Sequence, residues 1–225
     1  MNDVGAVVVA AGKGTRMGAA DRKPFLTMAG KPIVVHTLEA LSRAGVAEIV
    51  LVVGAEDVER ANRLCAEHRL DKVRKVVPGG AERQHSVLEG VRMLGSEWAL
   101  VHDGVRPFVT PDIVARCMEA ARRTGGAVAA VPVKDTIKMA DERGLVAATP
   151  DRSRLWAVQT PQVFRRRALQ DALEAALAEG FIGTDDAAAA ERAGIPVELA
   201  MGDYRNIKIT TPEDLALAKL WLNDA

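Results

Sequence analysis

The sequence predicts an α/β protein with a doubly wound, mostly parallel β-sheet and a protruding β-hairpin arm. Short apolar runs alternate with longer amphipathic segments along most of the chain, which is typical of successive βαβ units. The first run, residues 4–11, is apolar throughout, as expected of a strand that helices cover on both faces. The alternation stops at residues 134–161, where no helical period is present.

The individual elements follow from the same patterns and from the residues at their ends. Pro32 suits the start of a helix and Gly45 its end. Thr110-Pro111-Asp112 and Thr184-Asp185-Asp186 are typical of helix N-termini. We expect strands at residues 4–11, 48–54, 73–78, 98–104, 126–133, 155–159 and 196–200. We expect helices at residues 32–44, 57–69, 82–94, 111–123, 165–178, 184–193 and from 212 to near the C-terminus.

The irregular stretch has the chemistry of a hairpin. Two short β-like pieces, residues 136–139 and 145–148, flank Asp141-Glu142-Arg143-Gly144. A free hairpin is only marginally stable, so this arm, at about residues 134–154, should pack on something. A second subunit, and hence a homodimer, is the simplest candidate; a lid over the site is the alternative. We treat residues 1–225 as a single domain that includes the arm.

Composition restricts the classes of function. The chain has 225 residues, with 30 Lys and Arg against 30 Asp and Glu, so its formal net charge is zero. That balance argues against a broad basic surface for nucleic acid. Cys65 and Cys117 form no CxxC pair, which argues against a disulfide framework. No apolar stretch is long enough to cross a bilayer. We therefore expect a soluble, cytoplasmic protein without nucleic-acid or membrane partners.

The first strand leads directly into a glycine-rich loop, Gly12-Lys13-Gly14-Thr15-Arg16-Met17-Gly18, and Lys23-Pro24 follows. Glycines let backbone N–H groups approach phosphates, and Lys13, Arg16 and Lys23 add positive charge. The loop lacks the third glycine of the Rossmann fingerprint and does not match Walker A. The glycines alone would equally suit a plain strand-to-helix turn. With the added cations, the pattern predicts a triphosphate site.

A second candidate position lies at the end of another strand. Asp103 ends the strand at residues 98–104, and ligands of open α/β sheets bind outside the carboxyl ends of the strands. Asp103 should therefore lie on the same rim as Gly12. His102-Asp103 would also suit a metal-dependent hydrolase. That alternative is weak because His36, His68 and His85 provide no second histidine pair at ligand spacing.

The opening motif, Ala10-Ala11-Gly12-x-Gly14-x-Arg16-Met17-Gly18 with Lys23-Pro24, resembles the signature of the nucleotidyltransferases that make nucleotide sugars. Further motifs follow in order at residues 101–107, 132–138, 151–152, 160–162, 184–186 and 206–210. Over nearly the whole chain the set resembles the 2-C-methyl-D-erythritol 4-phosphate cytidylyltransferase family of non-mevalonate isoprenoid biosynthesis. The resemblance implies a Rossmann-like fold of the nucleotide-diphospho-sugar transferase type. The chain departs from the family pattern at Val9, Thr15 and Ala81.

The resemblance also implies a reaction. Enzymes of this kind transfer CMP from CTP to 2-C-methyl-D-erythritol 4-phosphate, giving 4-diphosphocytidyl-2-C-methyl-D-erythritol and pyrophosphate, with Mg²⁺ or another divalent cation. The acceptor brings an ionised phosphate oxygen, so catalysis should rest on positioning and electrostatic stabilisation. Ribitol-5-phosphate cytidylyltransferase looks alike in most of these motifs and is the alternative. A non-catalytic nucleotide-binding protein on the same fold is another.

The resemblance assigns roles residue by residue. From spacing alone, Arg152 and Lys208 would be ordinary surface residues, and only the resemblance makes them site residues. Asp103 is the single candidate for a metal ligand. The catalytic residues would be Arg16, Lys23, Arg152 and Lys208. The nucleotide would contact Ala10, Ala11, Gly12, Gly14, Thr15, Gly80, Ser86 and Asp103. The acceptor would contact Asp103, Gly104, Arg106, Thr136, Arg152, Thr160 and Lys208.

Overall fold

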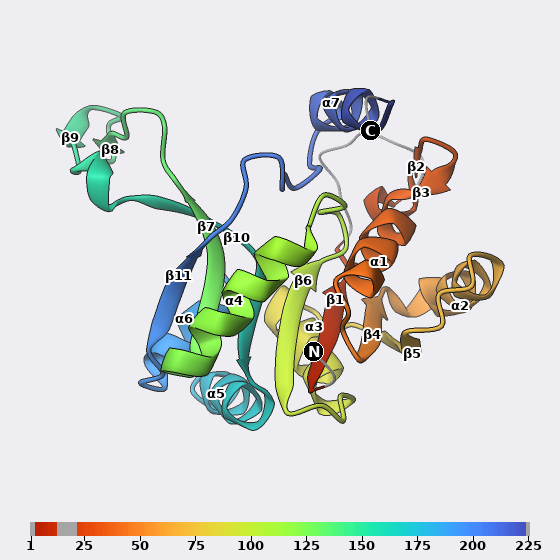
Figure 1. Ribbon diagram of the computed structural model, residues 1–225. Helices are drawn as coiled ribbons and strands as arrows, with labels where there is room; N and C mark the ends of the chain where they lie inside the picture. Colours follow the sequence, from red (N-terminus) through yellow and green to blue (C-terminus); the bar gives the residue numbers. More distant parts are fainter. Residues whose placement is uncertain (1–2, 13–21, 224–225) are drawn as a thin grey trace.

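A computed structural model describes residues 3–12 and 22–223 of the chain. Within these ranges the central sheet has seven strands, in the order β11-β7-β10-β6-β1-β4-β5 (Figure 1). Every neighbouring pair is parallel except those that β10 makes with β6 and β7, which are antiparallel. The mostly parallel α/β sheet is therefore confirmed. The strands are β1 (Val4–Val9), β4 (Glu48–Val53), β5 (Val73–Pro78), β6 (Trp98–Asp103), β7 (Gly126–Pro132), β10 (Trp156–Arg165) and β11 (Val197–Met201).

Helices cover both faces of this sheet (Figure 1). One face packs against α1 (Ile33–Arg43), α2 (Val58–Glu67) and α4 (Pro111–Thr124). The other packs against α3 (Arg83–Arg92), α5 (Arg166–Ala178) and α6 (Asp186–Arg192). Successive side chains of β1 enter opposite layers: Ala6 and Val8 join the first core cluster and Val7 the second. This two-sided burial explains why the strand is an uninterrupted apolar run.

The last part of the sheet differs from the expectation. We expected a short strand at 155–159, but β10 continues to Arg165, and α5 begins only at Arg166. Pairing of β10 with β7 shifts in register between Val158 and Gln162. Polar residues and a proline interrupt the apolar pattern there, which hides a long strand from a sequence reading. The short elements that were not expected include the 3-10 turns η2 (Lys23–Phe25) and η3 (Ala55–Asp57) and the strands β2 (Thr27–Met28) and β3 (Lys31–Pro32).

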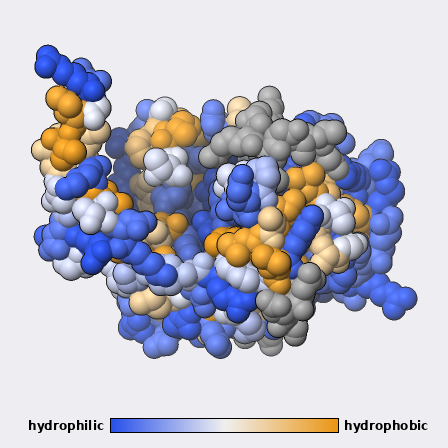
Figure 2. All heavy atoms as spheres, turned by 90° about the horizontal axis from the view of Figure 1, so that it is seen from above, coloured by the Kyte–Doolittle hydropathy of each residue, from blue (hydrophilic) through white to orange (hydrophobic). Residues whose placement is uncertain are grey.

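Between β7 and β10 the chain leaves the edge of the domain. It forms a small antiparallel pair of strands, β8 (Met139–Ala140) and β9 (Val146–Ala148), and a 3-10 turn, η4 (Arg152–Arg154). We call residues 134–154 the arm; it stands away from the sheet at the upper left of Figure 1. Apolar side chains are exposed on it, and Figure 2 shows hydrophobic atoms on this projection. The largest are Ile137, Met139, Leu145 and Val146.

The C-terminal helix α7 (Pro212–Asn223) joins three segments at the top of the domain (Figure 1). A small core cluster contains Ala218 of α7, Met28 of β2, Val105 after β6 and Ile209 before α7. Phe108 also meets Trp221 edge-on, with ring centroids 5.3 Å apart. The cluster therefore fixes the segments that follow Lys23, Asp103 and Lys208 relative to one another. In the part of the chain that is described, no helix is long and apolar enough to span a membrane.

Candidate active site

A cavity of about 640 Å³ opens at the carboxyl ends of β1 and β6. Figure 2 looks down on this rim of the sheet. Backbone and small side chains after β1 form one wall, the segment between β5 and α3 forms another, and charged side chains close the cavity. Its lining includes eight residues that the sequence analysis assigned to the site: Ala10, Ala11, Gly12, Lys23, Gly80, Ser86, Asp103 and Lys208. Gly14, Thr15 and Arg16 lie outside the described residues.

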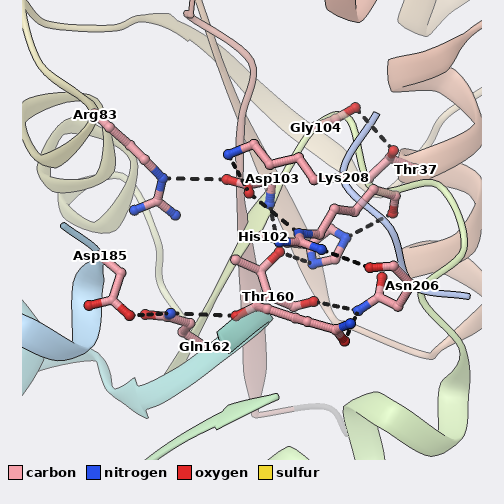
Figure 3. A network of polar contacts seen from close by, with 12 residues as sticks. Thr37, Arg83, His102, Asp103, Gly104, Thr160, Gln162, Asp185, Asn206 and Lys208 are labelled. Carbon is pink, nitrogen blue, oxygen red and sulfur yellow. Dashed lines mark hydrogen bonds and ion pairs between the residues drawn. The ribbon is translucent and has the colours of Figure 1, made fainter. Parts of the chain in front are cut away.

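Asp103 is the charged centre of this cavity. Its Oδ2 lies 2.9 Å from Lys208 Nζ and 3.5 Å from Arg106 Nε, and its Oδ1 lies 3.4 Å from Arg83 Nε. Figure 3 shows Arg83 and Lys208 pointing toward the carboxylate. Burial alone would raise the pKa of Asp103, but the charges of Arg83, Lys208 and Arg106 outweigh it and hold the pKa well below its usual range. Asp103 is therefore ionised at neutral pH.

Arg83 belongs to the site although the sequence analysis did not assign it. Its Nη1 and Nη2 donate to Asp186 Oδ1 and Oδ2 at 2.8 and 2.9 Å, a bidentate pair. The Asp186 side chain is 1% exposed. Burial raises the pKa of Asp186, and the charge of Arg83 opposes that rise. The signal for Arg83 was its place in the first turn after Gly79-Gly80, but no local pattern predicts a partner 103 residues away.

The turn between β5 and α3 is shaped by close packing. A Cβ on Gly79 would lie 2.6 Å from both Ala11 Cβ and Ser86 Oγ, so only glycine fits beside the end of β1. Ser86 Oγ accepts from the Gly80 backbone N–H at 3.1 Å and donates to the Glu82 carbonyl at 3.2 Å. The hydroxyl of Ser86 therefore holds the turn in shape, and the turn presents backbone to the cavity.

Three of the residues expected at the acceptor do not line the cavity: Thr160, Arg106 and Gly104. The Gly104 carbonyl accepts from the Thr37 hydroxyl at 3.0 Å. The Thr160 hydroxyl is buried, accepts from the Asp103 backbone N–H at 3.1 Å and lies 3.0 Å from His102 Nδ1. Arg106 Nη1 donates to the Asn206 carbonyl at 2.7 Å. These residues were expected to contact an acceptor. Their contact with an acceptor stays a prediction. Within this chain, the Thr160 hydroxyl bonds to the Asp103 backbone, as Figure 3 shows, and one Arg106 nitrogen bonds to the Asn206 carbonyl.

His102 and Asp103 are adjacent in sequence but take different roles. His102 is fully buried, and burial lowers its pKa to about 4, so the imidazole is neutral at pH 7. Its ring faces Thr160 and the Arg106 carbonyl rather than the cavity lining. Successive side chains of a strand point to opposite sides, which separates the two residues.

The structure does not bring Arg152 and Thr136 to the cavity. Both are exposed on the arm, and neither lines the cavity. Arg152 Nη1 donates to the Lys134 carbonyl at 2.6 Å, a contact within the arm itself. The physical reason is the path of the chain, because the arm leaves the sheet at the carboxyl end of β7 and stands away from it (Figure 1).

The donors at the site limit how a metal ion could be held. In residues 3–12 and 22–223, no group of three or more His, Cys, Asp or Glu side chains is placed to hold one. Asp103 offers a single ionised carboxylate at the cavity. Mg²⁺ is commonly bound by one or two carboxylates together with substrate phosphates and water. The residues present fit an ion of that kind, provided that a polyphosphate supplies most of its ligands.

Comparison with known proteins identifies relatives over the whole chain. The family model described as IspD, 2-C-methyl-D-erythritol 4-phosphate cytidylyltransferase, matches residues 4–224. The curated protein of that name from Geobacillus kaustophilus is 50% identical, over 95% of this chain and 94% of that protein. The one from Geobacter metallireducens is 46% identical, over 97% of each. The crystal structure of 4-diphosphocytidyl-2C-methyl-D-erythritol synthase from Anaerococcus prevotii matches with a TM-score of 0.85 and 31% identity, over 98% of each chain.

The Arg83–Asp186 pair generates a stability prediction. Replacing Arg83→Met leaves a buried carboxylate without its partner, so the free energy of unfolding should fall by about 3–5 kcal/mol. Arg92→Met is the matched control, because Arg92 is on the same helix but pairs with Glu89 and Glu174 at the surface. That control should cost less than about 1 kcal/mol. Urea denaturation at pH 7 measures the free energy of unfolding of both variants. Equal losses in Arg83→Met and Arg92→Met would contradict a structural role for the buried pair.

Proposed function

This chain belongs to the 2-C-methyl-D-erythritol 4-phosphate cytidylyltransferase family, and we propose that it transfers CMP from CTP to 2-C-methyl-D-erythritol 4-phosphate, releasing pyrophosphate. The observation that carries the proposal is the cavity at the sheet rim, where Lys23, Asp103 and Lys208 converge. The cavity volume of about 640 Å³ is typical of a small-molecule site. Its position outside the carboxyl ends of the strands is where α/β sheets bind ligands.

The nucleotide binds along the wall made by the end of β1 and the turn before α3. Ala10, Ala11 and Gly12 present little more than backbone there, and Gly80 of the neighbouring turn also lines the cavity. Small residues leave room for a pyrimidine ring and allow backbone N–H and C=O groups to contact its polar edge. The triphosphate then extends toward Lys23, the cation that follows the glycine-rich loop.

The chemical step needs no general base. An ionised oxygen of the acceptor phosphate attacks the α-phosphorus of CTP, forming a new P–O bond. The bond from the α-phosphorus to the oxygen that bridges to the β-phosphate breaks, and its electron pair leaves with pyrophosphate. Both reactants are anions, so the protein lowers the barrier by fixing them in line and by placing positive charge where negative charge builds up.

Lys23 supplies positive charge at the triphosphate. The residue is only 8% exposed and lines the cavity, which distinguishes it from an ordinary solvated lysine. The short turn η2 places it, and Phe25 in the same turn packs into the main core. Arg16, proposed as the second cation at the transition state, lies outside the described residues.

Lys208 supplies positive charge at the acceptor phosphate. Its ammonium lies 2.9 Å from Asp103 and its side chain is 39% exposed, so a phosphate can approach the same nitrogen. The neighbouring Arg106 guanidinium lies 3.5 Å from the same carboxylate oxygen. Asp103 thus holds both cations at the place where the acceptor would bind.

A divalent cation, of which Mg²⁺ is the proposed example, would be held mainly by triphosphate oxygens, with Asp103 as its protein ligand. When bound, such an ion neutralises phosphate charge and orients the triphosphate. The low pKa of Asp103 supports this assignment, because the carboxylate needs no deprotonation before it can coordinate.

The arm is proposed to form a homodimer and to place Arg152 and Thr136 at the cavity of the partner subunit. Its large apolar side chains stay partly exposed, from 37% at Ile137 to 63% at Val146. In a two-fold symmetric dimer each arm reaches the other subunit in the same way. Such an exchange would give both residues the acceptor role that the family resemblance assigns and that their own cavity does not offer.

The function is tested by pyrophosphate release from CTP with two acceptors side by side. We expect turnover with 2-C-methyl-D-erythritol 4-phosphate and much slower turnover with ribitol 5-phosphate. The two acceptors carry the same phosphate but differ in the polyol. Comparable or greater turnover with ribitol 5-phosphate would overturn the acceptor assignment, and no turnover with either would overturn the activity.

Lys23→Ala should lower kcat strongly. Loss of one preorganised charge at a transition state costs on the order of 10²–10³ in kcat. CTP should still bind, because the remaining wall of the cavity is intact. Steady-state kinetics and calorimetric titration with CTP measure the two effects. Lys31→Ala is the control, because Lys31 pairs with Glu39 and does not line the cavity. An unchanged kcat in Lys23→Ala would reject the assigned role.

Complementation between two inactive variants tests the exchange of arms. Lys23→Ala and Arg152→Ala subunits should each form an inactive homodimer. A mixed dimer would regain one intact site, which combines Lys23 of one subunit with Arg152 of the other. Random mixing by co-expression should restore about a quarter of wild-type activity, because half the dimers are mixed and each has one working site. No recovery, with mixed dimers demonstrated by affinity tags, would show that Arg152 does not act across the interface.

A further inference from the structure

A series of hydrogen bonds through Thr160 and His102 connects the backbone of Asp103 with the backbone of Arg106. The Asp103 backbone N–H donates to Thr160 Oγ1 at 3.1 Å. Thr160 Oγ1 lies 3.0 Å from His102 Nδ1, and His102 Nε2 lies 3.1 Å from the Arg106 carbonyl oxygen. Figure 3 shows the His102 ring between Thr160 and the loop that follows β6. His102 and Thr160 are both buried.

Simple donor and acceptor rules fix the position of each hydrogen. The Arg106 carbonyl can only accept, so His102 Nε2 carries a proton. The Thr160 hydroxyl already accepts from the Asp103 N–H and needs an acceptor for its own hydrogen. Among the described residues, His102 Nδ1 is the acceptor in reach. His102 is thus a neutral imidazole protonated on Nε2. Each hydrogen bond of the series is then donated in the direction from Asp103 to Arg106.

We propose that His102 is a positioning residue for the reaction: through Thr160 it fixes the backbone of Asp103, and through the Arg106 carbonyl it fixes the loop that carries the Arg106 guanidinium. The kinetic meaning of this inference rests on the proposed function, although the hydrogen-bond arrangement does not. His102 does not line the cavity, so it acts through its neighbours rather than on the substrates.

On the side that faces β10, the sheet gives Asp103 no strand partner, whereas on the other side Asp103 pairs with Val9 of β1. The pairing of β6 with β10 runs from Trp98 to Val101, opposite Arg165 to Gln162, and stops there. Two residues later, the Asp103 N–H finds a threonine hydroxyl instead of a strand partner. Three cations pull on the Asp103 carboxylate from different sides, so a loosely held backbone would let it shift between them. The hydrogen bond to Thr160 removes that freedom.

Two further hydrogen bonds hold the residues at either end of this hydrogen-bond series. Asn206 Nδ2 donates to the Thr160 carbonyl at 2.8 Å, which fixes Thr160 relative to the segment that carries Lys208. Thr37 Oγ1 donates to the Gly104 carbonyl at 3.0 Å, which fixes the start of the loop between Asp103 and Arg106. His102 is the link between these two supports, because it bonds to Thr160 on one side and to the loop on the other.

The arrangement is tested directly by nitrogen NMR of the full-length wild-type protein at pH 7. The long-range proton–nitrogen pattern of His102 should be that of the neutral Nε2–H tautomer. Its resonances are assigned by comparison with the His102→Gln protein. A Nδ1–H tautomer, or an imidazolium at pH 7, would overturn the inference. This result does not depend on what reaction the enzyme catalyses.

The positioning role is tested by two substitutions that each keep one half of the imidazole. His102→Asn keeps an oxygen near the position of Nδ1 but loses the donor to the Arg106 carbonyl. We expect the KM for the acceptor to rise about tenfold or more, because the Arg106 loop is freed. His102→Gln keeps a donor near the position of Nε2 but loses the acceptor for Thr160. We expect kcat to fall about tenfold or more, because Asp103 is freed.

The controls separate positioning from general loosening. His36→Gln makes the same change on α1, where His36 Nε2 lies 2.7 Å from the Met28 carbonyl, and should leave both constants unchanged. Thr160→Val combined with His102→Gln should be no worse than Thr160→Val alone, because Thr160→Val already removes the hydrogen bond to His102 as well as the one from Asp103. Wild-type constants in both folded His102 variants, or equal effects on the same constant, would overturn the inference. A wild-type enzyme without turnover would refute the proposed function and leave the NMR result standing.

Discussion

The pairing of Asp103 with three cations is the interaction on which the site depends. A carboxylate at the end of β6 holds Arg83, Arg106 and Lys208 around one point, and each cation comes from a different part of the chain. Positive charges would otherwise repel each other and turn toward solvent. Because Asp103 is ionised and buried among them, the three cations stay at the cavity. An anionic substrate that binds there can pair with the same cations.

Side chains of the antiparallel strand β10 hold Asp103 and Arg83 in place. It lies between β6 and β7, so its side chains reach both halves of the sheet. Gln162 accepts from the backbone N–H groups of Asp186 and Ala187 at 3.1 and 3.0 Å, and this fixes the start of α6. Asp186 in turn holds the guanidinium of Arg83, which contacts Asp103. Thr160, two residues earlier on β10, supports the backbone of Asp103 itself. One strand thus fixes the central carboxylate from two directions.

The domain divides its tasks between a closed body and an open projection. The body buries its strands on both faces, and α7 locks the segments near Lys23, Asp103 and Lys208 into one small core. Among the described residues the arm has neither kind of support, and its large apolar side chains are exposed. A site that combines the two would require association before it is complete, which would link activity to oligomeric state.

The sequence by itself determined the α/β class, most elements and the position of the cavity. Uninterrupted apolar runs and glycine at strand ends report local constraints, and the order of strands and helices follows from them. The strand-end rule correctly put Asp103 on the rim with Gly12. Tertiary structure decided the rest. The partner of Arg83, the role of His102 and the separation of Arg152 from its own cavity depend on contacts between residues far apart in the chain. Local patterns record which face of an element is buried, but they do not record which distant side chain will meet it there.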